Sequence, residues 1–174
     1  MSKRLLALIL LALVFPAVPG CSGGGKETQA LVDEAAGLMK QNKHQEALAR
    51  LDKAVKADPK DAKAHFYRGN ALSILGSKDE AIKEYDLAIK YAPDIPQPYY
   101  NKGNALANLE KSEEAVAAYD QAIARDPAYV KAYYNKALLL DRLGRKDEAR
   151  EVFDKANALS GAGAAMGGAT SARK

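Results

Sequence analysis

Small apolar residues and prolines recur along this chain at a fixed interval of 34 residues. Two sets of alanines and one set of prolines keep this interval over most of the sequence. They are Ala47, Ala81, Ala115 and Ala149; Ala54, Ala88, Ala122 and Ala156; and Pro59, Pro93 and Pro127. A period of this length indicates a solenoid, in which one supersecondary unit stacks on the next.

Inside each period, apolar residues are spaced three and four apart, as expected for a helix with one buried face. The second half of one copy illustrates this with Ala81, Ile82, Tyr85, Ala88 and Ile89. Ser77 and Glu80 precede this stripe and predict a capping box at the start of the helix. Prolines that follow Asp58, Ala92 and Asp126 predict its end.

Small and bulky positions alternate between the two halves of each copy, which predicts close packing of a helical hairpin. A small residue at the eighth place lets the two helices approach, and a bulky residue later in the copy fills the space beside it. The small residues are Ala35, Gly69, Gly103 and Ala137, and the bulky ones are Leu51, Tyr85, Tyr119 and Phe153.

The motif Gly69-Asn70-Ala71-Leu72 recurs as Gly103-Asn104-Ala105-Leu106, each time followed by the periodic alanines, tyrosine and proline. This pattern resembles the tetratricopeptide (TPR) repeat. The resemblance covers residues 28–161 as four copies, 28–61, 62–95, 96–129 and 130–161. It implies an all-α fold, a right-handed superhelical solenoid of four helix-turn-helix repeats.

The first twenty residues have a different composition and predict a signal peptide over residues 1–20. Lys3 and Arg4 precede an apolar run from Leu5 to Val18, which is too short to span a bilayer comfortably. Val18-Pro19-Gly20-Cys21 then resembles the lipobox of bacterial lipoproteins, in which the cysteine is acylated. Processing by an ordinary signal peptidase, which would leave a free thiol, is the alternative.

Cys21 is the only cysteine in the chain, so it has no intramolecular disulfide partner in an oxidising compartment. Lipidation explains an exported lone cysteine. Ser22 after it resembles the pattern that is sorted to the outer membrane. We therefore expect a lipid-anchored protein of the bacterial cell envelope, with its repeats facing the periplasm. The expected lipid is detectable by labelling with palmitate.

Flexible segments are expected at both ends of the repeats. Residues 21–27 are predicted to be the lipidated cysteine and a short tether. Residues 162–174 consist mainly of Gly, Ala and Ser and are predicted to form a disordered tail. Since no helix is expected after Leu159, the last hairpin is predicted to stay uncovered or to pair with another chain by self-association.

Charge and reactive side chains favour a binding protein over an enzyme. The chain has 26 basic and 22 acidic residues, and removal of Lys3 and Arg4 with the signal peptide leaves 24 basic ones. So small an excess of positive charge does not favour binding to nucleic acid. Of the two histidines, His44 is expected in a turn and His65 in packing. The sequence has no His or Cys pair at the spacing of metal ligands, no Gly-rich phosphate-binding loop and no Ser or Cys nucleophile with a base to activate it. We therefore expect no enzyme activity, no metal and no cofactor.

In TPR proteins the first helices of successive repeats line a concave groove, and the resemblance implies which residues face it. Asparagine offers donors and an acceptor to a peptide backbone, and aromatic rings offer contact area. These residues are also common in the family generally. The candidate groove consists of Lys63, Phe66, Asn70, Tyr100, Asn101, Asn104, Lys131, Tyr134 and Asn135.

Some TPR domains clamp the carboxylate of a chaperone C-terminus with two asparagines and three basic residues. Asn70, Asn101 and Lys131 match three of these places, but Phe66 and Asn135 stand at the other two, so we do not expect this activity. The expected function is a membrane-anchored periplasmic scaffold that binds a protein or an extended peptide. Alternatives are a pilotin-like assembly factor for a secretin or pilus and an accessory that recruits cell-wall enzymes.

Overall fold

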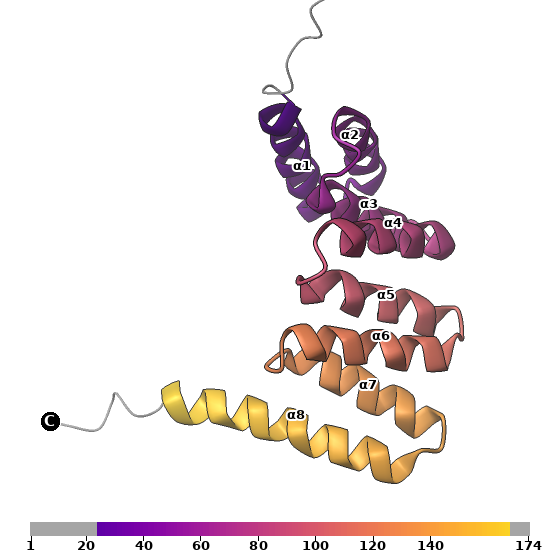
Figure 1. Cartoon of the computed structure of the whole chain (residues 1–174), viewed down its shortest axis with the longest axis vertical. Helices are drawn as coiled ribbons and strands as arrows, with labels where there is room; N and C mark the ends of the chain where they lie inside the picture. Colours follow the sequence, from indigo (N-terminus) through magenta and orange to yellow (C-terminus); the bar gives the residue numbers. More distant parts are fainter. Residues whose placement is uncertain (1–23, 168–174) are drawn as a thin grey trace, which may run out of the picture.

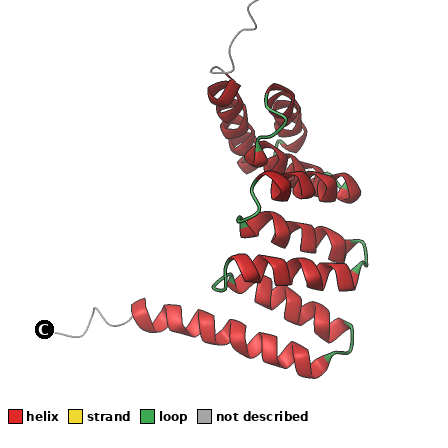
Figure 2. Cartoon of the chain, in the orientation of Figure 1, coloured by secondary structure: helices red, strands yellow, loops and turns green. Residues whose placement is uncertain are grey.

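The structure, a computed structural model, describes residues 24–167 and the side chains of residues 25–161. All regular structure within this range is helical (Figure 2). The helices are α1 (Gly24–Lys40), α2 (His44–Ala57), α3 (Ala62–Ile74), α4 (Lys78–Tyr91), α5 (Pro96–Asn108), α6 (Ser112–Arg125), α7 (Val130–Arg142) and α8 (Lys146–Gly167). The predicted all-α class is confirmed.

Consecutive helices pack as hairpins that stack in chain order (Figure 1). The odd-numbered helices also contact one another from hairpin to hairpin, α1 with α3, α3 with α5 and α5 with α7. Among the described residues, the even-numbered helices make no such contacts. The odd-numbered helices therefore form the inner layer of the solenoid, and the even-numbered helices form the outer layer.

Helix starts agree with the predicted register. Helices α3, α5 and α7 begin at Ala62, Pro96 and Val130, the first residues predicted for the second, third and fourth copies. The outer helices α2, α4 and α6 each end within two residues of the next proline, whose ring cannot continue a helix. The 34-residue period is thus a period of structure.

The turn inside each hairpin has the same backbone geometry, with one residue of positive φ after the first helix. These residues are Asn42, Gly76, Glu110 and Gly144. In each turn, the next N–H donates to a carbonyl one turn back, as Ser77 does to Leu72 over 3.0 Å. This bond closes a Schellman motif and satisfies a terminal carbonyl of the inner helix.

The Schellman motif explains why the capping box predicted from Ser77 and Glu80 is wrong. Ser77 is the N-cap of α4, but its side chain makes no capping hydrogen bond. The box also needs the Ser77 N–H as the donor to Glu80, and that N–H is already bonded to Leu72. The Ser77 N–H therefore caps the C-terminus of α3 and is not free to form a capping box at the N-terminus of α4.

In the second, third and fourth copies, the residue at the fourth place binds the inner layer to the preceding loop. The hydroxyl groups of Tyr99 and Tyr133 donate to the carbonyls of Pro93 and Pro127 over 3.0 and 3.1 Å. His65 is 5% exposed, with Nε2 3.0 Å from the carbonyl oxygen of Pro59 and Nδ1 2.7 Å from Glu84. The histidine expected in packing therefore also has both ring nitrogens partnered.

Both ends of the helical array are longer than predicted. Helix α1 begins at Gly24, so residues 24–27 of the predicted tether are helical, and Thr28 in the next turn is fully buried. Helix α8 continues to Gly167, so the disordered tail predicted from residue 162 is wrong for residues 162–167. No proline interrupts α8, and its alanines favour propagation. None of the described helices is long and apolar enough to cross a membrane.

Candidate functional site

The inner layer positions the predicted groove residues on α3, α5 and α7, and it brings the asparagines together in pairs. Nδ2 of Asn101 on α5 donates to Oδ1 of Asn70 on α3 over 2.7 Å. One repeat further on, Nδ2 of Asn135 on α7 donates to Oδ1 of Asn104 over 2.8 Å. The same amide hydrogen bond thus links two pairs of successive inner helices.

Each acceptor oxygen receives a second hydrogen bond, from a buried tyrosine of the outer layer. The hydroxyl of Tyr85 donates to Asn70 over 2.9 Å, and that of Tyr119 donates to Asn104 over 2.8 Å. Burial raises the pKa of the Tyr85 phenol, and burial is also the main cause that raises the pKa of Tyr119 to about 12. Both phenols therefore stay protonated at neutral pH and act as donors. We call these bonds the amide ladder.

The amide ladder changes what the asparagines can offer to a ligand. We expected donors and acceptor of each side chain to face a peptide, but Oδ1 of Asn70 and of Asn104 already accepts two hydrogen bonds within the chain. No hydrogen bond within the described chain involves Nδ2 of either residue. The ladder therefore orients these two amides as donors only.

Two hollows lie along the ladder and share Asn104. One, of about 310 Å³, is lined by Met39, Asn70, Ser73, Ile74, Tyr85, Asn101 and Asn104. The other, of about 270 Å³, is lined by Asn104, Ala107, Asn108, Tyr119, Asn135, Leu138, Leu139 and Arg142. Their shared edge makes a continuous row of amide donors and apolar surface along the inner layer.

The aromatic residues predicted for the groove differ in their surroundings. Tyr100 packs its ring against Tyr119 and Tyr129, at centroid distances of 5.9 and 5.2 Å, and its hydroxyl accepts from Asn135. Tyr134 instead turns toward α8, where its hydroxyl donates to Asn157 over 2.8 Å. Tyr100 therefore belongs with the ladder, whereas Tyr134 belongs with the last hairpin.

The two predicted lysines lie at the surface. Nζ of Lys63 forms an ion pair with Asp33 of α1 at 3.1 Å, and both side chains are largely exposed. Lys131 is exposed and forms no ion pair with any described residue. At the positions compared with a carboxylate clamp, Asn70 and Asn101 are hydrogen-bonded to each other, which further separates this site from such a clamp.

The comparisons with known proteins agree with this geometry. The tetratricopeptide repeat family model matches residues 32–96 and 100–164, which is most of the chain. The chain belongs to the tetratricopeptide repeat family. Among curated proteins, none matches it significantly.

Solved structures of TPR proteins superpose on the chain. A MamA crystal structure is 25% identical with a TM-score of 0.77, covering 80% of this chain and 82% of that one. MamA from Desulfovibrio magneticus RS-1 is 23% identical with a TM-score of 0.72, covering 78% and 76%. The first TPR of Spaghetti (RPAP3), bound to the HSP90 peptide SRMEEVD, is 24% identical with a TM-score of 0.67, covering 68% and 94%.

Tyr85 and Tyr119 take part in the amide ladder, whereas the sequence prediction assigned them only to packing. A signal for their second role was present, because they stand in the two TPR repeats whose ninth residue is asparagine. Where the ninth residue is Leu138, the matching residue is Phe153, which has no hydroxyl. A buried tyrosine usually needs a hydrogen-bond partner, so the pairing of Tyr with Asn predicts the bond.

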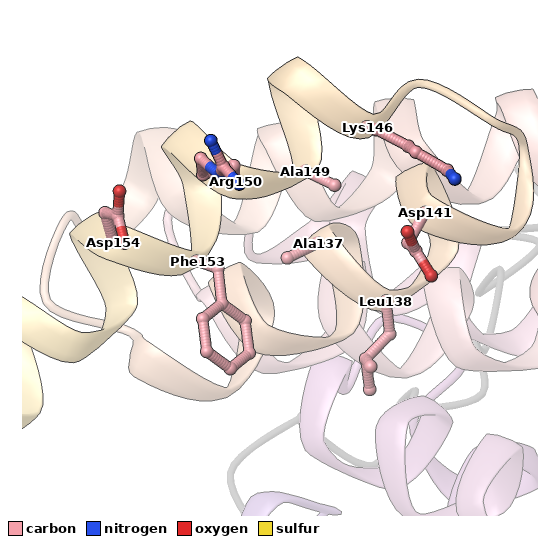
Figure 3. Close-up of a pocket in the computed structure, with 8 residues that line it drawn as sticks. All are labelled: Ala137, Leu138, Asp141, Lys146, Ala149, Arg150, Phe153 and Asp154. Carbon is pink, nitrogen blue, oxygen red and sulfur yellow. The ribbon is translucent and has the colours of Figure 1, made fainter.

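The last TPR hairpin carries a separate hollow of about 540 Å³, shown in Figure 3. Leu138 and Phe153 line it and are 55% and 41% exposed. Phe153 was predicted to fill the space beside the eighth residue, but it is much more exposed than Tyr85 and Tyr119, which hold the same place in their repeats. Ala137 carries a Cβ where Gly69 and Gly103 have none, and the Phe153 ring packs on Tyr134 at 5.2 Å. Self-association through this face stays a prediction.

Metal-binding groups were also sought among the described residues. Within residues 24–167 there is no group of three or more His, Cys, Asp or Glu side chains that could hold a metal ion. TPR proteins generally act as interaction modules without catalysis. The site that the described residues support is therefore a surface for binding protein.

Proposed function

We propose that this protein is a lipid-anchored scaffold whose TPR groove binds an extended segment of a protein partner. The observation that carries the proposal is the amide ladder. It holds Asn70 and Asn104 as oriented donors, one repeat apart, beside hollows lined by both polar and apolar side chains. An extended peptide has unpaired backbone carbonyls, and amide donors fixed in advance bind them with little loss of conformational entropy.

The solved relatives support binding of a peptide by this fold. The first TPR of Spaghetti holds an HSP90 peptide in its structure. This chain lacks basic residues at two of the clamp positions, where it has Phe66 and Asn135. We therefore propose an internal or extended segment as the ligand, recognised through its backbone and apolar side chains.

Site-specific photo-crosslinking in envelopes tests the groove. A photoreactive amino acid at Ser73 would lie in the hollow beside Asn70, and one at Lys83 would lie on the exposed outer face of α4. We expect protein adducts from position 73 and none of the same mass from position 83. Adducts from position 83 alone would contradict groove binding. Mass spectrometry of the adduct then separates secretin or pilus subunits from cell-wall enzymes and other partners.

The proposed anchor requires its own experiment, because the predicted signal peptide and Cys21 lie outside the described residues. If Cys21 is acylated, the protein labels with palmitate and sediments with outer membranes, and Cys21→Ala abolishes the label. Two or more acyl chains anchor a protein firmly, whereas one binds only marginally. A soluble and unlabelled wild-type protein would refute the anchor and leave the groove proposal standing.

A further inference from the structure

An apolar hollow of about 310 Å³ lies beside the ladder, where α3, α4 and the start of α5 meet. It is lined by Ala62, Lys63, Phe66, Ala88, Ala92, Ile95 and Pro98. Lys63 is the only charged residue among these. The volume is at the low end of the range for small-molecule pockets, a size suited to one side chain and not to a whole cofactor.

The next repeat shows what fills the equivalent space. Phe66 corresponds to Tyr100, and Ile95 corresponds to Tyr129, each one period later. The Tyr129 ring packs edge-on against Tyr100 at a centroid distance of 5.2 Å and 78° between the ring planes. Burial raises the pKa of Tyr129, as expected for a phenol held in this space. In the second repeat the branched Ile95 has no ring to place there and is 46% exposed.

We propose that this hollow is an anchor pocket for one aromatic side chain of the bound partner, an inference that rests on the groove proposal. The ring of the partner would take the place relative to Phe66 that Tyr129 takes relative to Tyr100. Edge-to-face contact with Phe66 adds to the burial of the ring against the alkyl side chains of Ile95 and Ala92. The pocket adjoins the ladder through α3, so one extended segment reaches both.

The charge at the pocket selects an acidic residue next to the aromatic one. Lys63 presents an ammonium group at the lining, and its present partner, Asp33, is an exposed carboxylate. Exposed pairs of this kind contribute little, so a carboxylate of the partner can exchange with Asp33. The C-terminal segment 168–174 of this chain has no aromatic residue and ends in Arg173 and Lys174, so it does not match this chemistry.

A displayed library of random peptides, selected on the immobilised full-length chain, tests the pocket. The decisive variant is Ile95→Tyr, which supplies the ring that the second repeat lacks. Asp94→Tyr is the matched control, because it adds the same side chain at a neighbouring exposed residue outside the lining. Enriched peptides are then synthesised with a fluorophore, and fluorescence anisotropy measures their affinity for each protein.

We expect enriched peptides to share one Phe or Tyr beside an Asp or Glu. Replacing that aromatic residue by Ala, or using Ile95→Tyr, weakens binding about 10- to 100-fold, whereas Asp94→Tyr stays within about twofold. Ile95→Tyr should melt at or above the temperature of the parent, which shows that it is folded.

Two failures are distinguishable. Peptides that lose affinity with Tyr100→Ala but bind Ile95→Tyr like the parent would overturn the aromatic pocket and leave groove binding intact. Peptides that are indifferent to both variants, or a library that yields no binder, would overturn the pocket and the proposed groove together.

Discussion

A Cβ atom placed on Gly69 would lie only 2.6 Å from Cε1 of Tyr85. A Cβ atom placed on Gly103 would lie at the same distance from Cε1 of Tyr119, one repeat later. In the first repeat Ala35 faces Leu51, and both are fully buried. The eighth residue thus decides which side chain its hairpin accepts, and in two repeats it brings a tyrosine hydroxyl to the ladder.

Gly69→Ala is therefore expected to destabilise the protein by about 1–3 kcal/mol, because the Tyr85 ring is buried and has little space to move. Urea unfolding followed by circular dichroism measures the change. Gly37→Ala is the control, because its Cβ would meet nothing within 4 Å in α1. That control should gain about 0.5–1 kcal/mol from helix propensity.

A double variant tests whether the clash is the cause. Adding Tyr85→Leu to Gly69→Ala reproduces the pair that Ala35 and Leu51 form in the first repeat. The double variant should be more stable than the sum of the two single changes, a coupling of about 0.5–3 kcal/mol. Simple additivity would show that the ring and the eighth residue do not interact.

Tyr85→Phe is expected to destabilise the protein by about 0.5–1.5 kcal/mol, because it deletes the hydroxyl that donates to Asn70 and keeps the ring. Tyr91→Phe is the control, since the structure gives the Tyr91 hydroxyl no hydrogen bond with a described residue. It should lie within about 0.5 kcal/mol of the parent. Equal effects of the two variants would mean that the ladder contributes nothing to stability.

Alkaline pH should unfold the protein through the same tyrosines. The unfolded chain releases tyrosine protons near pH 10, as model peptides do. Burial raises the pKa of Tyr119 to about 12 in the folded chain, so the protonated phenol stabilises the fold below pH 10. That contribution is lost as pH rises from about 10 through about 12. Unfolding across this range should be less steep in pH for Tyr119→Phe than for the parent.

The turn after α5 offers a stabilising change. Glu110 has a φ of 60°, whereas the equivalent residues Gly76 and Gly144 are glycines. A side chain in this conformation costs about 1–2 kcal/mol, and glycine loses part of that gain through entropy. Glu110→Gly should therefore raise the stability by about 0.5–1 kcal/mol in thermal unfolding. Gly76→Ala should lower it, although no atom lies within 4 Å of its Cβ.

Most of the fold could be predicted from the 34-residue period of the sequence. The starts of α3, α5 and α7 follow from the resemblance to the TPR repeat, and the close approach at Gly69 follows from residue size. Other features could not be predicted, because they depend on which of several possible partners a polar group binds, and residue spacing does not decide that. The Ser77 N–H is a donor for either of two caps, and the Schellman motif takes it. Phe153 lies in the last described hairpin, so no ninth helix among residues 24–167 covers it.

The sequence predicted which asparagines lie in the candidate site, but it did not predict whether their side chains offer donors or acceptors to a ligand. Asn70, Asn101, Asn104 and Asn135 do lie together, as their places in the repeat implied. Which end of each amide faces a ligand depends on the hydroxyl groups of Tyr85 and Tyr119, which come from the other layer. A prediction based on one helix face cannot include that contact. The pairing of tyrosine with asparagine across repeats is the signal that would have supplied it.

The double variant Asn70→Asp and Asn104→Asp tests whether the groove presents hydrogen-bond donors, and it keeps the hydrogen bonds of the amide ladder. Aspartate keeps an oxygen to accept from Tyr85, Tyr119, Asn101 and Asn135, and it replaces each Nδ2 donor by an oxygen that cannot donate. Asn157→Asp is the charge control, because it keeps the acceptor for Tyr134 on the last hairpin. Both proteins should melt close to the parent.

Calorimetric titration of the double variant with the partner captured at position 73 is the most direct test of groove binding. Two lost hydrogen bonds of about 0.5–1.5 kcal/mol each should lower the affinity about 5- to 150-fold, with Asn157→Asp unchanged. A double variant that is folded and binds the partner as tightly as the parent would contradict the claim that the amide ladder presents donors to a bound peptide.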